Sequence, residues 1–556
     1  MIRTHIDLEA RRRRLIERSR HRLMVALLLF IGAFTILAAR TVELGVLRYH
    51  RPDTQFASDA ARLSARADIV DRNGLILATN VAAASLFADP HLIADPEQAV
   101  IKLRHILPDQ DAETLRRKLQ SDRRFVWIKR RLTPEQMWRV NSLGLPGLDF
   151  QEEEERIYPH GRLAAHLIGF VGDDGQGLHG VEHFFQRRLS DPTRVHEPLT
   201  LSLDMRVQHI LTDALTAAQA RHRAKAAVGL VLDVRNGETL ALASLPDFDP
   251  NAGAQAPKSA LMNRATLGVY ELGSVFKTFT LAAALDAGVV DLSDGYDASR
   301  PIRVARHAIR DHHPKNRWLS VPEIFAFSSN IGAAKMAMDL GTARQRQFLG
   351  QLGLLSAPAY ELTEIGAPLL PSQWHEVETM TVSFGHGLAV SPLQLGRAMA
   401  AMVNGGDLVP VTLLKRQWAL GTEERRPVIS ADTSAQMRQL MRLVVSNGTG
   451  QHADIAGYHV GGKTGTAEKA SAGGYDRGAL LSSFVAAFPI QAPRYLVFVM
   501  LDEPIGIEAT HQFAGGGWVA APAVGEIIAR IAPMLGLPPV PADPGYVREA
   551  ALYMME

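Results

Sequence analysis

The longest apolar run of the chain lies close to the N-terminus. Residues 23–39 read LMVALLLFIGAFTILAA, carry no charge and are followed by Arg40. Residues 1–22 hold eight arginines against three acidic residues, and arginine-rich flanks stay on the cytoplasmic side of a membrane. The pattern predicts a cytoplasmic basic tail over residues 1–22, one transmembrane helix over residues 23–44 and an external remainder. A cleaved signal peptide is the alternative, which the long charged leader and the lack of a clean A-x-A site disfavour.

Residues 45–220 have the pattern of a folded scaffold or partner-binding module. Residues 66–80 read as two short strands around an Asn-Gly pair, which is a strong signal for a hairpin turn. Residues 93–145 form amphipathic helical segments that prolines separate. Within residues 45–220, no nucleophile, base and oxyanion donors combine into a site.

The pattern changes near residue 226. Residues 226–245 predict two apolar strands joined at a second Asn-Gly turn. Helices follow, and three antiparallel strands with short connections come near the end: residues 457–470, 482–491 and 494–504. Residues 525–535 predict a closing helix, with a loose tail after it. This order predicts a mixed α/β domain whose sheet is completed by both ends of its chain.

Composition narrows the class of protein. The 556 residues are too many for one ordinary core, so at least two domains are expected. The net charge of +2, with 21% charged residues, argues against a nucleic-acid binder and against a disordered chain. The absence of cysteine excludes disulfides, thiol catalysis and cysteine-ligated metals. The histidines form no H-x-x-x-H motif with a helical carboxylate, and His312 and His313 are expected to be surface polar residues, so no metal site is predicted.

The first candidate for chemistry is the stretch ELGSVFKTFT, residues 271–280. Ser274 is expected to begin a helix that ends at Gly288, and Lys277 follows one turn later on the same face. A desolvated lysine has a lowered pKa and can be the base that a serine nucleophile needs. About two S-x-x-K matches arise by chance in a chain of this length, so this match alone does not decide the function.

A second candidate lies between two predicted helices. Ser320 and Glu323 have the spacing of a capping box, which predicts a helix that leads to Ser328 and Asn330. A hydroxyl and a carboxamide two residues apart, at a break between helices, can face the same cavity. A simple polar turn between helices would give the same pattern.

The third candidate is Lys463-Thr464-Gly465-Thr466, in the first of the three terminal strands. Glycine weakens a strand unless another backbone or a ligand approaches it closely. The threonine hydroxyls and the lysine charge suit a carboxylate-bearing peptide laid along the strand edge. An exposed edge strand with a protective lysine is the structural alternative.

In this order along the chain, the three motifs are the signature of penicillin-binding proteins and class A β-lactamases. The chain resembles the class B penicillin-binding proteins, most closely their septal D,D-transpeptidases (FtsI-like), from the apolar run to about Leu535. RADIVDRNGLILA and RIYPHGRLAAHLIGFVG resemble the N-terminal module of that class, and SFGHGLAVSPLQL, KTGTAEK and SSFVAAFPIQAPRY resemble its transpeptidase domain. No stretch resembles the glycosyltransferase of class A members. His386 in SFGHG departs from the aromatic residue of many septal enzymes, so an elongation-type class B transpeptidase stays open as an alternative.

The resemblance implies a fold for each part of the chain. Residues 221–537 are expected to form a penicillin-binding/β-lactamase-like transpeptidase domain, with a central antiparallel sheet and helices on both sides. Residues 45–220 are expected to form an elongated α+β pedestal similar to the penicillin-binding protein dimerisation domain, and residues 538–556 a C-terminal tail.

The resemblance also implies catalytic roles. Ser274 attacks the carbonyl of a terminal D-Ala-D-Ala on a peptidoglycan stem peptide, and Lys277 takes its proton. The backbone N–H groups of Ser274 and Thr466 hold the oxyanion, and Ser328 and Lys463 relay a proton to the departing D-alanine. An amine of a neighbouring stem peptide then resolves the acyl-enzyme, whereas β-lactams leave a slowly hydrolysed ester. No metal or organic cofactor is implied.

Four residues are implied in substrate binding. Asn330 holds the amide of the donor peptide, while Thr464, Gly465 and Thr466 lie along the strand edge that receives it. The hydroxyls of the two threonines bind its terminal carboxylate.

The implied partners are peptidoglycan stem peptides, β-lactams and membrane-embedded division proteins, including a glycosyltransferase that polymerises lipid II. The implied location is the bacterial inner membrane, with a cytoplasmic N-terminus and a periplasmic catalytic domain. Two alternatives stay open: hydrolysis by the same site, as in a β-lactamase or D,D-carboxypeptidase, and a β-lactam sensor or non-catalytic scaffold. The anchor and the long pedestal favour the transpeptidase.

Overall fold

The structure, a computed structural model, describes residues 24–25, 27–40, 66–304, 307–416, 425–471, 474–541 and 546–554. The chain separates into two compact units, Met1–Ala65 and Arg66–Glu556. In the first unit the described residues between 24 and 40 are helical, and the predicted tail over residues 1–22 lies outside the described residues. Across the described ranges, none of the helices combines the length and apolar character that crossing a membrane requires.

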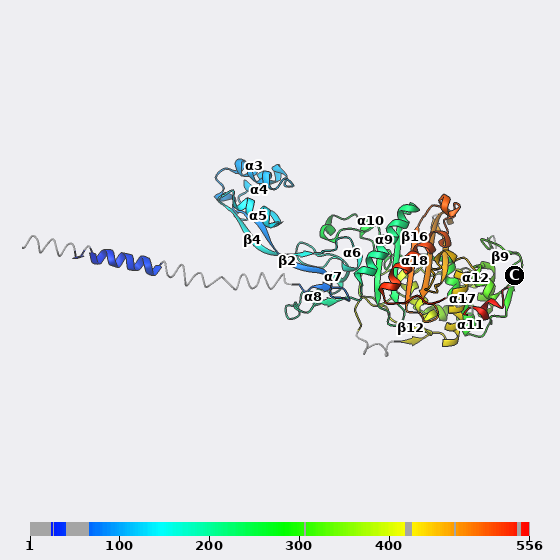
Figure 1. The fold of residues 1–556 in the computed structure, drawn as a ribbon. Coiled ribbons are helices and arrows are strands. Elements are labelled where there is room, and N and C mark those ends of the chain that lie inside the picture. The colour runs from blue at the N-terminus through cyan, green and yellow to red at the C-terminus, as the bar shows by residue number, and fades with distance from the viewer. Residues whose placement is uncertain are drawn as a thin grey trace, which may run out of the picture. The chain divides into compact units, whose positions relative to one another are not determined.

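The N-terminal part of the second unit is built around a five-stranded sheet (Figure 1). The predicted hairpin is present: β1 (Ile69–Val70) pairs antiparallel with β2 (Ile76–Ala88), which is longer than expected and extends to pair with β3 and β4. The turn is held by the Asp71 carboxylate, which accepts the N–H groups of Asn73 and Leu75. The other strands are β3 (Val126–Leu132), β4 (Leu148–Ile157) and β5 (Leu199–Thr200).

The amphipathic segments predicted over residues 93–145 are helices. They are α3 (Pro96–Ile106), α4 (Ala112–Leu119) and α5 (Pro134–Asn141). Each begins after a residue whose side chain accepts a backbone N–H of the first turn: Asp95, Asp111 and Thr133. Shorter helices follow at α6 (Ala165–Ile168), α7 (Gly180–Phe184) and α8 (Gln186–Leu189).

A buried ion triad joins distant parts of this region. Glu182 on α7 receives Arg66 at 2.5 Å and Arg156 of β4 at 2.7 Å. Both arginines also donate to backbone carbonyls, Arg66 to Glu182 itself and Arg156 to Ala67. Because each charge is paired and hydrogen-bonded, the triad can be buried without leaving an isolated charge.

The C-terminal part contains a five-stranded antiparallel sheet in the order β14-β15-β16-β6-β7. Its strands are β6 (Ala226–Asp233), β7 (Thr239–Leu245), β14 (Gly461–Ser471), β15 (Gly474–Phe488) and β16 (Tyr495–Asp502). The predicted completion of the sheet by both ends of the domain's chain is confirmed, because β6 lies beside β16. Strand β14 forms one edge.

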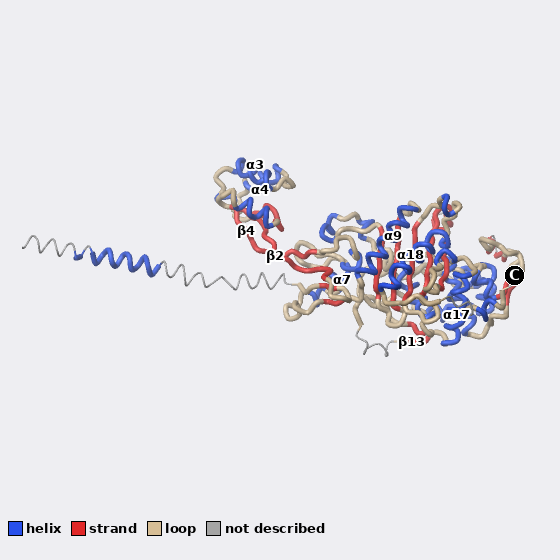
Figure 2. Tube along the Cα trace, in the orientation of Figure 1, coloured by secondary structure: helices blue, strands red, loops and turns tan. Residues whose placement is uncertain are grey.

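Helices cover both faces of this sheet (Figures 1 and 2). Alternate residues of one strand point to opposite sides, so Leu230 and Leu232 of β6 enter one core and Val231 enters the other. The Val231 side packs against α9 (Met205–Arg221) and α18 (Gly516–Met534). The opposite side packs against α11 (Lys277–Asp286), α16 (Pro392–Val403) and α17 (Ala431–Ser446).

The remaining elements surround these layers. The helices are α10 (Lys258–Leu261), α12 (Val321–Ala326), α13 (Asn330–Leu340), α14 (Thr342–Gln351), α15 (Glu376–Val382) and α19 (Arg548–Ala551). The short strands are β8 (Gly295–Asp297), β9 (Ile302–Val304), β10 (His307–Ile309), β11 (Trp318–Ser320), β12 (Asp407–Leu408) and β13 (Arg426–Pro427). Single 3₁₀ turns are η2 (Pro90–Leu92), η3 (Pro250–Gln255), η4 (Gly273–Phe276), η6 (Gln451–Ala453) and η7 (Glu508–Thr510).

Two expectations for the C-terminal end were wrong. Helix α18 begins at Gly516, well before the expected start at residue 525. The prediction placed the start too late because the first turns consist of glycine and alanine around Trp518 and include Pro522, which the sequence pattern does not mark as helical. The tail is not loose throughout: Ala550 of α19 is buried in the core, and the Tyr546 hydroxyl donates to the Ile490 carbonyl at 3.2 Å.

Candidate active site

Ser274 and Lys277 face each other at the start of α11. Ser274 lies on the 3₁₀ turn η4, not in an α-helix as expected, and α11 begins at Lys277. The Lys277 Nζ lies 2.9 Å from the Ser274 Oγ. Gly273 has φ +58°, and a Cβ there would lie 2.4 Å from the Thr466 carbonyl oxygen. Glycine at this position therefore allows the turn to contact β14 directly.

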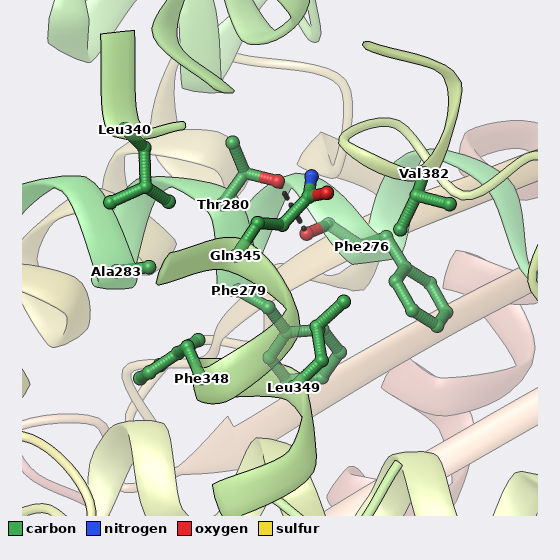
Figure 3. Close-up of a pocket in the computed structure, with 9 residues that line it drawn as sticks. All are labelled: Phe276, Phe279, Thr280, Ala283, Leu340, Gln345, Phe348, Leu349 and Val382. Atoms are coloured by element: carbon green, nitrogen blue, oxygen red, sulfur yellow. Dashed lines mark hydrogen bonds between the residues drawn. The ribbon is translucent and has the colours of Figure 1, made fainter. Parts of the chain in front are cut away.

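The turn rests on a tightly packed helix (Figure 3). Phe276 and Phe279 meet edge to face at 5.4 Å. They line, with Phe348 and Leu349 of α14, a cavity of about 10 Å³, which is room for roughly one water molecule. The Thr280 hydroxyl donates to the Ser383 carbonyl at 2.8 Å. Such packing fixes the position of the catalytic turn, because close-packed interiors resist small displacements.

Ser328 lies between α12 and α13, at the break predicted from the sequence. The capping box of Ser320 and Glu323 that begins α12 is present in both directions. Ser328 has φ +60°, in the left-handed region that non-glycine residues rarely adopt. In this conformation its carbonyl and its hydroxyl both face Lys277, with distances to Nζ of 2.6 Å and 3.1 Å.

Lys463 completes a network of four side chains. Its Nζ donates to the Ser328 Oγ at 2.9 Å, so Ser328 joins the two lysines. Lys463 is fully buried and Lys277 is 2% exposed. The structure thus brings together Ser274, Lys277, Ser328 and Lys463, which the sequence places far apart.

The two buried lysines have lowered pKa values. Burial lowers the pKa of Lys463 to about 7. Burial, and then the charge of Lys463, hold the pKa of Lys277 well below its ordinary value, while Asp311 opposes this shift. Two ammonium groups around one hydroxyl repel each other, so the arrangement favours a neutral Lys277 beside Ser274.

Asn330 begins α13 and is held by the loop before β11. Its side-chain nitrogen donates to the Arg310 carbonyl at 2.8 Å. Its Oδ1 is buried and, within the described ranges, has no hydrogen-bond partner. A buried acceptor without a partner suits an amide N–H of a bound peptide.

Asp311 is a residue that sequence reasoning missed. Its Oδ1 accepts the N–H groups of Asn330 and Ile331, and its Oδ2 accepts the Ser329 hydroxyl. It therefore caps the helix that carries Asn330 and fixes the segment around Ser328. The only signal was the polar loop RDHHPKN, in which spacing gives no reason to single out the aspartate. His312 and His313 of the same loop are exposed, as expected.

The strand β14 presents its motif residues on two sides. The hydroxyl of Thr464 hydrogen-bonds the Thr449 hydroxyl at 2.8 Å, and that of Thr466 accepts the Gly516 N–H at 3.0 Å. Both threonines therefore lie toward the start of α18, whereas Lys463 and Gly465 alternate with them and lie toward the catalytic turn. No hydrogen bond links Thr464, Thr466 or Asn330 to Ser274 among the contacts of the described residues.

Replacing Gly465 with alanine is expected to impair acylation. A Cβ there would lie 2.3 Å from the Ser483 Oγ, 2.6 Å from the Leu272 carbonyl oxygen and 2.8 Å from Val275. Because Leu272 and Val275 flank Ser274, the substitution moves the nucleophile away from β14. A displacement of about 1 Å costs on the order of 10²-fold in rate.

The measurement is the second-order rate of labelling by a fluorescent penicillin. Gly478→Ala on the neighbouring strand is the matched control, since its Cβ would meet only the Asp476 carboxylate, at 3.3 Å. Equal rates for the two variants would contradict the inferred close approach of the turn to Gly465.

Over the ranges that the structure describes, no three or more His, Asp or Glu side chains gather in a way that could hold a metal ion. The network of two hydroxyls and two amines is instead the donor set of a serine nucleophile with a lysine base.

The chain matches two families along most of its length. Residues 227–529 match the penicillin binding protein transpeptidase domain, and residues 61–188 match the penicillin-binding protein dimerisation domain. The chain is 42% identical, over 85% of its length and 82% of the relative, to the protein named "Probable peptidoglycan D,D-transpeptidase FtsI" of Caulobacter vibrioides. It is 29% identical to the peptidoglycan D,D-transpeptidase FtsI of Escherichia coli K12, over 86% of this chain and 84% of that protein.

A solved structure shares the fold. The crystal structure of a peptidoglycan synthetase from Bifidobacterium adolescentis aligns with a TM-score of 0.67 and 22% identity, covering 87% of this chain and 98% of that one. The two family matches cover both folded regions, and the serine-lysine network lies inside the region that matches the transpeptidase domain. The chain therefore belongs to the class B penicillin-binding proteins.

Proposed function

We propose that this protein is a peptidoglycan D,D-transpeptidase that cross-links stem peptides through an acyl-enzyme on Ser274, in septal wall synthesis. The observation that carries the proposal is the buried network in which the Lys277 Nζ lies 2.9 Å from the Ser274 Oγ. The names of the FtsI relatives from two organisms support both the activity and the role in division.

Acylation begins with the neutral amine of Lys277. It takes the proton of the Ser274 hydroxyl as Oγ attacks the carbonyl carbon between the two D-alanines. The oxyanion forms against the backbone N–H groups of Ser274 and Thr466, on elements that are in contact through Gly273. The four-residue network then carries the proton to the departing D-alanine through the Ser328 Oγ, which lies within 3.1 Å of both lysine Nζ atoms.

The donor peptide lies along the edge strand β14. An edge strand offers unpaired backbone groups to an extended peptide, and β14 is an edge of its sheet. Asn330 supplies the unpaired Oδ1 to an amide of the peptide. The hydroxyls of Thr464 and Thr466 receive its terminal carboxylate.

The parts outside the catalytic domain anchor and position it. We assign residues 1–22 as a cytoplasmic basic tail, residues 23–44 as a single transmembrane helix and residues 45–220 as the pedestal. Residues 221–537 are the transpeptidase domain, and residues 538–556 are a C-terminal tail. The arginine-rich flank supports a cytoplasmic N-terminus. The active site then lies on the periplasmic side of the inner membrane. The partners are then division proteins of the same membrane, including a glycosyltransferase that polymerises lipid II.

Product analysis tests the function. Full-length protein in detergent, given a stem pentapeptide ending in D-Ala-D-Ala and a second stem peptide with a free side-chain amine, is expected to release D-alanine and form a cross-linked dimer. Release of D-alanine without any dimer over a range of acceptor concentrations would identify a carboxypeptidase. No release and no penicillin adduct would leave a non-catalytic scaffold.

A further inference from the structure

A carboxylate near the nucleophile in the sequence has one oxygen that no hydrogen-bond donor of the described residues reaches. Glu271 precedes Ser274 by three residues, and its Oε1 accepts the Gly387 N–H at 3.0 Å and the Tyr475 hydroxyl at 3.2 Å. Its Oε2 is buried and has no hydrogen-bond partner in the part of the chain that the structure describes. None of the ion pairs found among these residues includes Glu271. Burial accordingly raises the pKa of this carboxyl.

A histidine in the same cluster also has a ring nitrogen without a hydrogen-bond partner among the described residues. His386 lies between Phe384 and Tyr475, with ring centroids 5.3 Å from each. Its Nδ1 is buried, and the described residues supply it with no partner. Burial, followed by the charge of Lys277, lowers the pKa of His386 to about 4, so the imidazole is neutral at pH 7 and one ring nitrogen is an acceptor.

The cluster is tied to the catalytic turn on both sides. The Gly385 carbonyl, next to His386, accepts the Gly273 N–H, and the Gly387 N–H binds Glu271. The glycines on either side of His386 are thus fixed to the residues on either side of Leu272. After burial, Lys277 has the largest effect on the pKa of His386, so the imidazole lies within electrostatic range of the reaction centre.

Two acceptor atoms without donors define the ligand by its chemistry. A carboxylate oxygen and a neutral imidazole nitrogen are filled together by a group with several N–H donors and a positive charge, which is a primary ammonium. We propose that Glu271 and His386 bind the ammonium of the acceptor stem peptide, the second substrate of the transfer. The amine enters beside Tyr475, which is 46% exposed and whose hydroxyl donates to the Glu271 Oε1, and it binds the vacant Oε2.

The site supplies the proton balance that aminolysis needs. The bound ammonium gives one proton to the Glu271 carboxylate and becomes a neutral amine. Its lone pair attacks the ester carbon on Ser274, the new C–N bond forms, and the bond between that carbon and Oγ breaks. The second proton of the amine passes through the Lys277 Nζ to Oγ, which restores the serine hydroxyl, and the Glu271 carboxyl then releases its proton to water.

Glu271→Gln tests this inference, which rests on the proposed transpeptidase function. The amide keeps an acceptor for the Gly387 N–H and the Tyr475 hydroxyl and removes the negative charge. With full-length protein, acylation by fluorescent penicillin is expected to stay within twofold of the wild type. The KM for the acceptor peptide in the cross-linking assay is expected to rise roughly tenfold to a hundredfold, the loss of one charged hydrogen bond.

Glu468→Gln is the matched control, because Glu468 is a half-buried carboxylate of β14 that acts on Tyr475 through its charge, whereas Glu271 accepts the Tyr475 hydroxyl and the Gly387 N–H directly. Its acceptor KM is expected to equal that of the wild type. Equal increases of the acceptor KM in both variants would show that the effect comes from the general negative charge of the cleft, and would overturn the assignment. An unchanged acceptor KM in Glu271→Gln would overturn it as well. If the wild-type protein forms no cross-link, the proposed transpeptidase function itself is wrong. The two outcomes above concern the acceptor site alone and leave that function intact.

Discussion

Full-length Ser274→Ala is expected to form no covalent adduct with benzylpenicillin, whereas the wild-type protein forms one stable adduct. Two serine hydroxyls of the described residues hydrogen-bond Lys277, and of these the Ser274 Oγ, at 2.9 Å, lies on the turn against β14. Removing a serine nucleophile from a network of this kind lowers turnover on the order of 10⁶-fold, because the remaining groups act through it. Intact-protein mass spectrometry measures the adduct directly.

The control for this prediction is a serine outside the active site. Ser293, in an exposed turn where its N–H and hydroxyl both donate to Asp291, is expected to give a normal adduct when replaced by alanine. Thermal unfolding of both variants should match the wild type. An adduct on Ser274→Ala of the same stoichiometry as on the wild type would refute the assignment of the nucleophile.

Lys277→Met is expected to slow acylation by about 10² to 10⁴-fold, the range for loss of a general base. Methionine keeps an unbranched chain in the buried site, so the loss isolates the amine. Stopped-flow labelling with a fluorescent β-lactam gives the rate. Lys277→Arg is the informative companion, because arginine keeps the positive charge and donors and cannot serve as a base. Wild-type rates in Lys277→Arg would show that Lys277 acts only as a charge.

The pH profile of the wild type follows from the same residue. The base must be neutral, so the acylation rate rises as pH rises through the pKa of Lys277 and is constant above it. Because burial and Lys463 hold that pKa well below 10.5, the plateau is expected well before the pH at which a free lysine titrates. A rate that is still rising at pH 10 would contradict a neutral Lys277 at neutral pH.

The features that the sequence predicted are those that depend on neighbouring residues. The Asn73-Gly74 hairpin, the Ser320–Glu323 capping box and the apolar strands of the sheet follow from turn chemistry and periodicity, which act over a few residues. The three motifs were placed at a helix start, a helix break and a strand for the same reason. Their assembly into one network required the resemblance, since no local rule brings residue 274 beside residue 463.

The features that the sequence did not predict depend on tertiary contacts. The 3₁₀ turn at Ser274 is set by the approach of Gly273 to the Thr466 carbonyl, and helix α18 begins among glycines that stand against Thr466 and Ser483. Asp311 acts on residues nearly twenty positions away, and Glu271 is notable only because its second oxygen lacks a partner. Unsatisfied atoms and long-range caps are properties of the packed structure and have no sequence pattern.

The position of β6 inside the sheet, between β7 and β16, has a consequence for how the protein is made. Its neighbour β16 follows more than 250 residues later in the chain, so β6 pairs only with β7 until nearly all of the domain has left the ribosome. At a synthesis rate of about 5–20 residues per second, this interval lasts tens of seconds. During that time an apolar strand edge of β6 is open to wrong pairing, so chaperones that cover this edge are expected to raise the yield of folded protein.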